Sequence, residues 1–372
     1  MNPSPADLGY RMPAEWETHE ATWIAWPHAR EDWPGKFAPI PWVYTEIVRN
    51  LSRFEDVNIL IRSIAMKRRV SDRLELAGAN LKRVRFFKAA TDRAWVRDSG
   101  PTFVVMNPAA NPGERDGNPP ILLIDWRFNA WAKYDNWKRD NRLPRKIATW
   151  LELPRWTPRF RQDGRKFRVV MEGGAIDVNG KGTLLATEEC LLSPIQARNP
   201  DMSRKDIEAV FADNLGIRHV IWLGQGIAGD DTHGHVDDLA RFVDPTTVVT
   251  VVERRPDDPN YGPLRENLAR LQAAKDQDGN PLRVVELPMP APVVFDHQWL
   301  PASYANFYIA NGVVLVPTFN DPADREALTI LAGLFPDREV IGIHCVDLVF
   351  GLGTLHCLTQ QQPAVPVAEA AT

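Results

Sequence analysis

Apolar and polar positions along the chain predict an α/β fold in which helices and strands recur many times. Apolar residues follow helical spacing over residues 41–54, 66–79, 141–152, 203–214, 262–275 and 322–334. Short apolar runs that suit buried strands lie between them, at residues 57–61, 84–87, 121–124, 167–171, 219–223, 247–252 and 283–287. Strands outnumber helices, which argues against a plain doubly wound sheet, where strand and helix alternate more strictly.

Three local signals mark the ends of elements. Ser203, with Asp206 three residues on, predicts a capping box at the start of the helix over 203–214. Asp321 and Pro322 predict the N-cap and the first helical position of the helix over 322–334. The dipeptide Asn311-Gly312 is typical of a two-residue turn, so we expect a hairpin over 306–316.

By size alone, 372 residues would fill two or three domains, but no linker divides the chain. Residues 107–120 form a loop rich in Pro, Gly and Asn, and no internal sequence repeat is visible. Residues 362–372 suit a loose C-terminal tail. We therefore expect a single domain over residues 1–361, followed by a tail over 362–372.

Composition and charge exclude several classes of partner. Lys and Arg number 44 against 48 Asp and Glu, a formal charge of −4, whereas nucleic-acid binders usually carry a basic excess or face. The first residues lack the basic and apolar regions of a signal peptide, and no apolar run approaches the ~20 residues of a membrane span. Three cysteines without CxxC spacing suggest neither a disulfide framework nor a zinc motif. We expect a cytoplasmic protein without nucleic-acid or membrane partners.

Four short segments combine glycine with acidic residues, His or Cys. They are residues 95–101 (WVRDSGP), 171–175 (MEGGA), 229–238 (GDDTHGHVDD) and 351–362 (GLGTLHCLTQQQ). The last contains Cys357, which follows a glycine-containing bend, whereas Cys190 and Cys345 lie in apolar surroundings and are expected in the core. A nucleophilic cysteine needs an accessible, electropositive or His-assisted setting. A buried free cysteine is the commoner case, so both interpretations of Cys357 stay open at this point.

The 229–238 segment offers a general base. His235 and Asp237 lie two residues apart, so in a strand both side chains share one face, which His233 joins if the extended geometry continues. Three such groups suit a metal site, although no fourth ligand is marked elsewhere. An acid/base site that binds a cation explains them equally well, and so does a solvated acidic loop.

Glu172 and Asp98 each follow a strand-like run and stand shortly before a glycine. Buried carboxylates are costly unless they are paired, and a positively charged ligand would pair them. A cysteine, a histidine and three carboxylates together suit attack on a planar cationic carbon. A guanidinium fits, because carboxylates bind it through bidentate hydrogen bonds.

These motifs, in this order, resemble the agmatine deiminase family, also called the Porphyromonas-type peptidylarginine deiminase family, within the guanidino-group-modifying enzymes. The resemblance spans nearly the whole chain and also includes residues 12–17 (MPAEWE), 22–27 (TWIAWP), 128–131 (FNAW) and 304–308 (YANFY). It implies a pentein fold, a pseudo-fivefold α/β propeller of five ββαβ blades that forms one catalytic domain.

The resemblance also implies a role for each matching residue. The Cys of the C-terminal His-Cys-(Ile/Leu)-Thr-Gln motif is the family's nucleophile, here Cys357. The His of Gly-His-x-Asp is the general acid/base, here His235. The Asp of the same Gly-His-x-Asp motif, here Asp237, binds the guanidinium together with the Asp of Trp-x-Arg-Asp, here Asp98. Glu172 of Glu-Gly-Gly orients the histidine and contacts the substrate.

The implied reaction is hydrolysis of agmatine to N-carbamoylputrescine and ammonia through a covalent amidino-thioether, a step of putrescine and polyamine metabolism. It requires no metal and no organic cofactor. We expect a small cationic guanidino substrate and a homo-oligomer, specifically a dimer.

Two segments depart from the family pattern. Residues 351–354 read Gly-Leu-Gly-Thr where Gly-Gly-Gly-Asn is frequent, and residues 130–132 read Ala-Trp-Ala where Trp-Gly-Gly is common. The pocket around the far end of the substrate can therefore differ. This leaves open a deiminase of free or peptidyl arginine, an amidinotransferase that uses an amine in place of water, and a binding protein with a dead site. The intact set of Cys357, His235, Glu172, Asp98 and Asp237 speaks against the last alternative.

Tryptophan is unevenly distributed, since eleven of the 13 lie at or before Trp156. A tryptophan-rich N-terminal half needs either a large hydrophobic core or a surface that binds a ligand. Cations favour aromatic faces, so we interpret Trp95, three residues before Asp98, as a wall of the substrate pocket. Most of the other tryptophans are assigned to packing.

Overall fold

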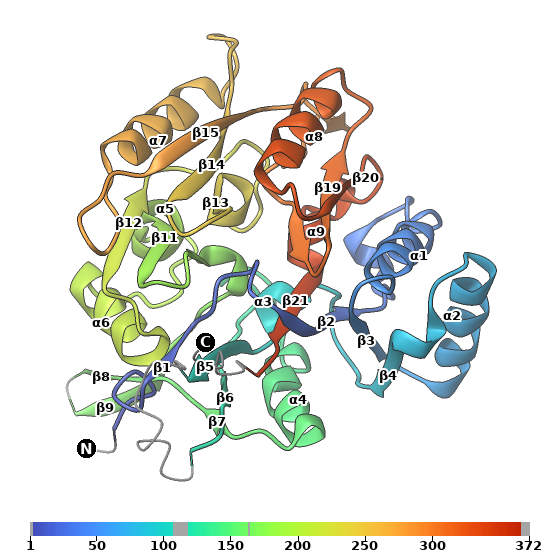
Figure 1. Cartoon of the computed structure of the whole chain (residues 1–372), viewed down its shortest axis with the longest axis horizontal. Coiled ribbons are helices and arrows are strands. Elements are labelled where there is room, and N and C mark those ends of the chain that lie inside the picture. The colour runs from blue at the N-terminus through green and yellow to red at the C-terminus, as the bar shows by residue number, and fades with distance from the viewer. Residues whose placement is uncertain (1–2, 107–117, 163, 366–372) are drawn as a thin grey trace, which may run out of the picture.

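The computed structural model describes residues 3–106, 118–162 and 164–365, and its strands form several small sheets (Figure 1). Two larger sheets have four strands each. In sheet order they are β1-β5-β6-β7 (Tyr10–Arg11, Thr102–Met106, Ile121–Ile124, Arg155–Trp156) and β21-β2-β3-β4 (Thr359–Pro363, His19–Ala25, Asp56–Ile61, Val84–Lys88). Three larger sheets have three strands each: β10-β11-β12 (Asp177–Val178, Thr183–Thr187, His219–Leu223), β13-β14-β15 (Ala240–Phe242, Thr247–Val252, Arg283–Pro288) and β18-β19-β20 (Tyr308–Ala310, Val313–Thr318, Glu339–His344). Two further pairs are β8-β9 (Arg159–Gln162, Arg165–Arg168) and β16-β17 (Val294–Phe295, Gln298–Trp299). None of these sheets closes on itself within the described residues.

Helices connect the parallel strands. The longer ones are α1 (Ile40–Leu51), α2 (Ile64–Leu76), α4 (Leu143–Leu151), α6 (Arg204–Leu215), α7 (Tyr261–Ala273) and α8 (Ala323–Leu334). The short ones are α3 (Val96–Ser99), α5 (Glu188–Leu192) and α9 (Leu355–Leu358), with 3₁₀ turns η1 (Arg30–Asp32), η2 (Leu81–Arg83), η3 (Asp140–Arg142), η4 (Gly173–Ala175), η5 (Val236–Asp238) and η6 (Val349–Gly351). No described helix has the length and apolar character that a membrane crossing requires.

Each larger sheet contains the same ββαβ unit: two antiparallel strands, then a helical crossover to a parallel strand. The first two strands of the units are β5-β6, β10-β11, β13-β14, β18-β19 and β21-β2, and the parallel third strands are β7, β12, β15, β20 and β3. The last unit joins both ends of the chain, because β21 near the C-terminus pairs with β2 near the N-terminus. This pairing ties the C-terminal segment to the sheet before the chain ends.

Most elements lie where the apolar pattern predicts them, and the local signals explain their ends. The capping box at Ser203 and Asp206 is present, and α6 ends at Gly216, whose φ of 69° is the left-handed conformation that glycine adopts readily. The predicted hairpin is β18-β19, and its turn contains Gly312 with φ of 72°. A side chain at Gly312 would collide with the ring of Phe54, so close packing also requires glycine there.

Four predictions need correction. The helix expected over 66–79 occupies Ile64–Leu76, and the strand expected over 167–171 ends at Arg168, after which Val170 makes only an isolated bridge to Arg127. Helix α8 begins at Ala323, so Pro322 is its cap, while Asp321 Oδ1 accepts from the Ala323 amide at 2.8 Å. The tail does not begin at residue 362, because residues 362–363 are buried in β21. Residues 107–117 of the predicted loop and 366–372 of the tail lie outside the described residues.

The largest apolar cluster runs through most of the sheets, and a smaller one lies among β1, β5, β6, β10, β11, β12 and α6. Near the middle of Figure 1, the short helix α3 lies beside α9 and β21. The turn η4 contacts both α3 and η5, so segments far apart in the sequence meet at one place.

Candidate active site

The segments that meet there hold the same position in their ββαβ units, directly before the first strand. Asp98 lies in α3 before β5, Glu172 precedes η4 and β10, and Asp237 lies in η5 before β13. Asn306 stands before β18, and Cys357 lies in α9 before β21. Each of the five units therefore supplies one polar side chain to the same centre.

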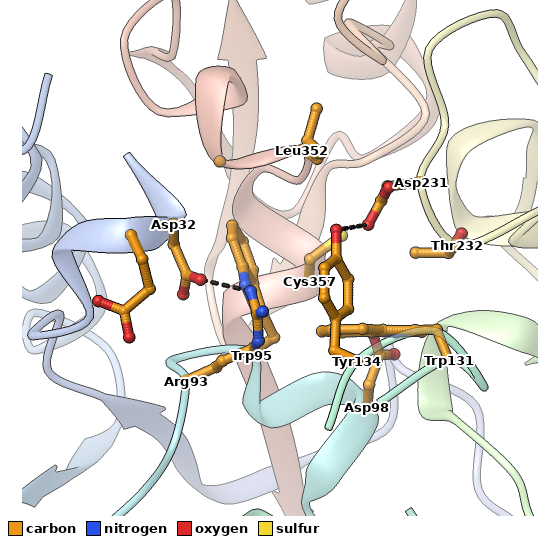
Figure 2. A pocket seen from close by; sticks show the side chains of 12 residues that line it. Asp32, Arg93, Trp95, Asp98, Trp131, Tyr134, Asp231, Thr232, Leu352 and Cys357 are labelled. Carbon is orange, nitrogen blue, oxygen red and sulfur yellow. Dashed lines mark hydrogen bonds and ion pairs between the residues drawn. The ribbon is translucent and has the colours of Figure 1, made fainter. Parts of the chain in front are cut away.

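A cavity of about 290 Å³ opens onto this centre (Figure 2). Asp98, Cys357 and Trp95 line it. His235, Glu172 and Asp237 are buried at the inner end of the cavity, where His235 lies beside Asp98 and Glu172, and Asp237 beside Cys357. The remaining lining residues are Glu31, Asp32, Arg93, Trp131, Tyr134, Asp231, Thr232, Gly351 and Leu352.

The thiol of Cys357 is almost completely buried at one end of the cavity. Its Sγ lies 3.2 Å from Asn306 Nδ2 and 3.8 Å from Asp237 Oδ2. Burial raises the pKa of Cys357 well above its ordinary value, and the charges of Asp237, Asp238 and Asp98 raise it further. In the absence of a cation the sulfur is therefore a thiol, and a positive charge bound beside it would favour the thiolate.

Asp98 is held by two donors. Its Oδ1 accepts from the Gly174 amide at 3.0 Å, and its Oδ2 accepts from Trp131 Nε1 at 2.9 Å. Burial raises the pKa of Asp98, and the neighbouring Asp237 and Glu172 also raise it, against the lowering effect of His235. A carboxylate in this environment gains stability from any cation that enters the cavity.

The two carboxylate oxygens of Asp237 differ in hydrogen bonding. Its Oδ2 lies 2.6 Å from His356 Nδ1, whereas its buried Oδ1 has no hydrogen-bond partner among the described residues. Burial acts to raise the pKa of Asp237, but His356 and His235 hold it below its ordinary value, so the group is ionised. An ionised, buried oxygen without a partner indicates a missing hydrogen-bond donor, which a bound ligand would supply.

His235 lies between carboxylates. Its Nε2 is 3.5 Å from Glu172 Oε2, and its Nδ1 is 3.9 Å from both Asp98 Oδ1 and Asp237 Oδ1. Burial acts to lower the pKa of His235, but Asp98 and Glu172, together with Cys190, raise it well above its ordinary value. The ring is therefore protonated and can donate a proton to a group bound beside Asp98 and Asp237.

Glu172 is oriented by Arg198, whose Nε donates to its two oxygens at 3.3 and 3.1 Å. Burial acts to raise the pKa of Glu172, whereas Arg198 and His235 lower it below its ordinary value. The glycines after Glu172 are required by close packing: a Cβ at Gly174 would lie 2.5 Å from His235 Nδ1.

The metal alternative drawn from the sequence is not supported by the geometry. Asp237 lies in the 3₁₀ turn η5 and His235 is the N-cap of that turn, so the two are not in a strand, and His233 has a φ of 65° with its ring toward Ser193. Glu172, Cys190 and His235 do place ligand atoms within 4.8 Å of one another. In this set, Glu172 is already paired with the guanidinium of Arg198.

The rest of the cavity lining, called the outer end below, consists of ion pairs and aromatic rings. Arg93 donates to Asp32 Oδ1 and stacks on Tyr134 at 4.2 Å from the ring centre. Asp231 accepts from Lys133 and, at 2.7 Å, from the Tyr134 hydroxyl. Figure 2 shows Asp231 and the Tyr134 hydroxyl above the Trp131 ring, the Asp32–Arg93 pair beside Trp95, and Asp98 at the bottom of the view.

The two segments that depart from the family pattern, residues 130–132 and 351–354, contribute residues to the lining of this cavity. Ala130, Trp131 and Ala132 have φ of 52°, 59° and 53°, a left-handed run without glycine that directs the Trp131 N–H to Asp98. Leu352, with φ of 68°, lines the wall, and Thr354 is buried with its hydroxyl 2.7 Å from Asn306 Oδ1.

Several site residues were not found by sequence reasoning. Asn306 contacts the thiol, and His356 bridges Asp237 and Glu15, with its Nε2 2.8 Å from Glu15 Oε2. Asn306 lies in the 304–308 motif and His356 in the 351–362 segment, but nothing in the sequence indicates the contacts that they make. Cys190 was assigned to the core and is buried there, yet it also lies beside His235.

Three comparisons link the whole chain to known proteins. The sequence model of the family described as Porphyromonas-type peptidyl-arginine deiminase matches residues 11–363. An agmatine deiminase of Stutzerimonas stutzeri is 36% identical over 98% of each chain. A solved agmatine deiminase of Enterococcus faecalis matches with a TM-score of 0.84 and 31% identity, over 98% of each chain. A Cys-to-Ser variant of C. jejuni agmatine deiminase with substrate bound matches with a TM-score of 0.81 and 27% identity, over 96% of this chain and 97% of that one.

Proposed function

Since the chain belongs to the Porphyromonas-type peptidyl-arginine deiminase family, we propose that it is an enzyme that hydrolyses agmatine to N-carbamoylputrescine and ammonia. The full-length similarity to agmatine deiminases supports this substrate. The observation that carries the proposal is a thiol between two carboxylates, Asp98 and Asp237, of which Asp237 keeps a buried oxygen without a partner among the described residues.

Asp98 and Asp237 bind the guanidinium of the substrate. Each carboxylate is held on the protein side, by Trp131 and Gly174 or by His356, so its position is set before the substrate arrives. Charge-assisted hydrogen bonds to a planar guanidinium fix its orientation as well as its position. The reacting carbon is then presented to Cys357 in a defined geometry.

Cys357 is the nucleophile. The bound cation lowers the pKa of the thiol, whose proton leaves to solvent, and the thiolate attacks the guanidinium carbon. His235, held by Glu172, gives its proton to one nitrogen, and ammonia departs as the C–N bond breaks. An amidino-thioether remains on the sulfur.

His235, now neutral, takes a proton from water as the water attacks the same carbon. The C–S bond breaks and the thiolate leaves. The hydroxyl proton that remains on the product passes to the released ammonia, which becomes ammonium, and the neutral ureido product is released. Carbon, nitrogen and charge balance without an oxidant or a metal: one guanidinium and one water give one urea and one ammonium.

The proposed fold follows from the recurring ββαβ unit. The chain shares its α/β fold with solved agmatine deiminases. We propose that its five units are the blades of a pseudo-fivefold pentein propeller with the active site at the centre. A single catalytic domain, a homodimer and a cytoplasmic location stay predictions.

Mass spectrometry of the intact protein during turnover tests the reaction. Incubation with agmatine should add one amidino adduct, located at Cys357, and should release ammonia. Cys357→Ser should abolish both, whereas Cys345→Ser, at a buried cysteine that does not line the cavity, should keep both. Arginine and a blocked arginine serve as competing substrates, and an amine acceptor in place of water tests for an amidinotransferase. Ammonia release that persists in Cys357→Ser would overturn the mechanism.

A further inference from the structure

We propose that the outer end of the cavity binds a second positive charge, the primary ammonium of agmatine, through the carboxylate of Asp32. This inference rests on the proposed function, because it concerns which guanidine the same site accepts. It assigns Asp32 as a specificity-determining residue rather than a catalytic one.

The geometry of Asp32 carries the argument. Its side chain is 0% exposed, although the residue lines the cavity. Oδ1 accepts from Arg93 Nη1, and the buried Oδ2 has no hydrogen-bond partner among the described residues. A buried carboxylate oxygen usually has a partner, so the orphaned Oδ2 indicates that a donor enters from the cavity.

The two ends of the cavity share this feature. Among the described residues, the buried carboxylate oxygens without a partner are Asp32 Oδ2 and Asp237 Oδ1. Asp237 lies beside Cys357, whereas Asp32 is paired with Arg93 in the outer part of the cavity lining. An α,ω-dication, with a guanidinium at one end and an ammonium at the other, would satisfy both oxygens at once.

The charge of the outer end selects a cation over a carboxylate. Its acids are Glu31, Asp32 and Asp231, and its bases are Arg93 and Lys133, which leaves a net charge of −1. Each base is already paired, Arg93 with Asp32 and Lys133 with Asp231. The α-carboxylate of free arginine would therefore meet a negative field, whereas an ammonium would be attracted.

The walls between the ends suit the carbon chain of the same molecule. Trp95, Trp131 and Leu352 present apolar surface along the cavity. The Tyr134 ring, which already stacks on Arg93, lies beside them. Aromatic faces also attract cations, so they favour an ammonium placed near Asp32.

Titration of Asp32 gives a second measurable consequence. Burial raises the pKa of Asp32 to about 7, against the lowering effect of Arg93, with Glu31 raising it further. The other titratable groups that sense its charge are Tyr44, Tyr134 and Asp140. An ammonium favours the ionised carboxylate, so the apparent affinity for agmatine should weaken as the pH falls below about 7.

The decisive experiment compares agmatine with n-butylguanidine, which has the same chain but no amine. The natural protein should prefer agmatine in kcat/KM by about 10- to 100-fold, the value of one hydrogen bond to a charged group. Asp32→Asn should remove this preference by lowering the agmatine value, with the butylguanidine value within about threefold of the natural protein. Glu31→Gln, which removes an exposed carboxylate at the same end, should lower the agmatine value less than Asp32→Asn does.

Other outcomes separate this inference from the proposed function. Equal losses for both substrates in a folded Asp32→Asn protein would assign Asp32 a structural role and overturn the inference. So would equal kcat/KM values for the two guanidines in the natural protein, a result that holds even if Asp32→Asn fails to fold. Failure of the natural protein to release ammonia from any guanidine would instead overturn the proposed function.

Discussion

At the inner end of the cavity, Asp98, Asp237 and Cys357 come from three different ββαβ units and meet because each stands before the first strand of its unit. At the outer end, Asp32, Arg93 and Tyr134 lie in connecting segments and are held by one another through an ion pair and a stacked ring. The inner groups are thus positioned by topology, and the outer groups by local contacts.

This difference separates the reaction from substrate choice. Changing an inner residue removes a group that only its own unit can supply. Changing an outer residue removes one of several contacts that hold this region together, and the region is partly exposed to solvent. We therefore expect large effects on turnover at the inner end and graded effects on substrate preference at the outer end.

The sharpest contrast is between two aspartates, one at each end. Asp237→Asn should lower kcat/KM for agmatine at least about 100-fold, because it removes a buried charge that pairs with the guanidinium. Asp231→Asn should lower it less than about 10-fold, since Asp231 is already neutralised by Lys133. Steady-state ammonia release measures both variants, and equal losses would contradict the division of roles.

Trp131 lies between the two ends and tests how they are coupled. Trp131→Phe removes the N–H that donates to Asp98 and should lower kcat/KM about 10-fold, the cost of one hydrogen bond to a charged group. Burial already raises the pKa of Asp98, and loss of this donor raises it further. The ionised form that binds the guanidinium is then lost at a higher pH, so the acidic limb of the kcat/KM profile should move upward.

Trp150→Phe is the control for this variant, because it makes the same change at a partly buried tryptophan in α4, outside the cavity lining. It should leave the acidic limb where it is in the natural protein. A profile that moves equally in both variants would mean that Trp131 acts through general packing.

The smallest expected effect concerns stability at the left-handed run. Ala132 is exposed with a φ of 53°, a conformation costly for residues other than glycine. Ala132→Gly should raise the free energy of unfolding by about 0.5–1 kcal/mol, after allowance for the greater chain entropy of glycine. Urea unfolding measures this change. Ala273→Gly, at the end of α7, should act in the opposite direction, because glycine disfavours a helix.

The sequence alone was sufficient for the α/β class, most element positions, the capping box at Ser203 and the turn at Gly312, because these depend on periodicity and on residues close together in the chain. It also predicted the side chains that we propose to carry the chemistry. A Cβ at Gly174 would lie 2.5 Å from His235 Nδ1, and one at Gly353 would lie 3.2 Å from Cys357 Sγ, so close packing favours glycine in these two motifs. The recurring ββαβ unit left no visible sequence repeat, since only its topology recurs.

The tertiary structure alone decided how those groups act on one another. His356, Asn306 and Glu15 reach the site from distant segments, and no spacing in the sequence predicts such contacts. The same holds for the orphaned oxygens of Asp32 and Asp237, because an unpaired polar atom is recognised only when all its neighbours are known. The residue types follow from the chemistry that a guanidinium requires, whereas charge, burial and pairing depend on which segments the fold brings together.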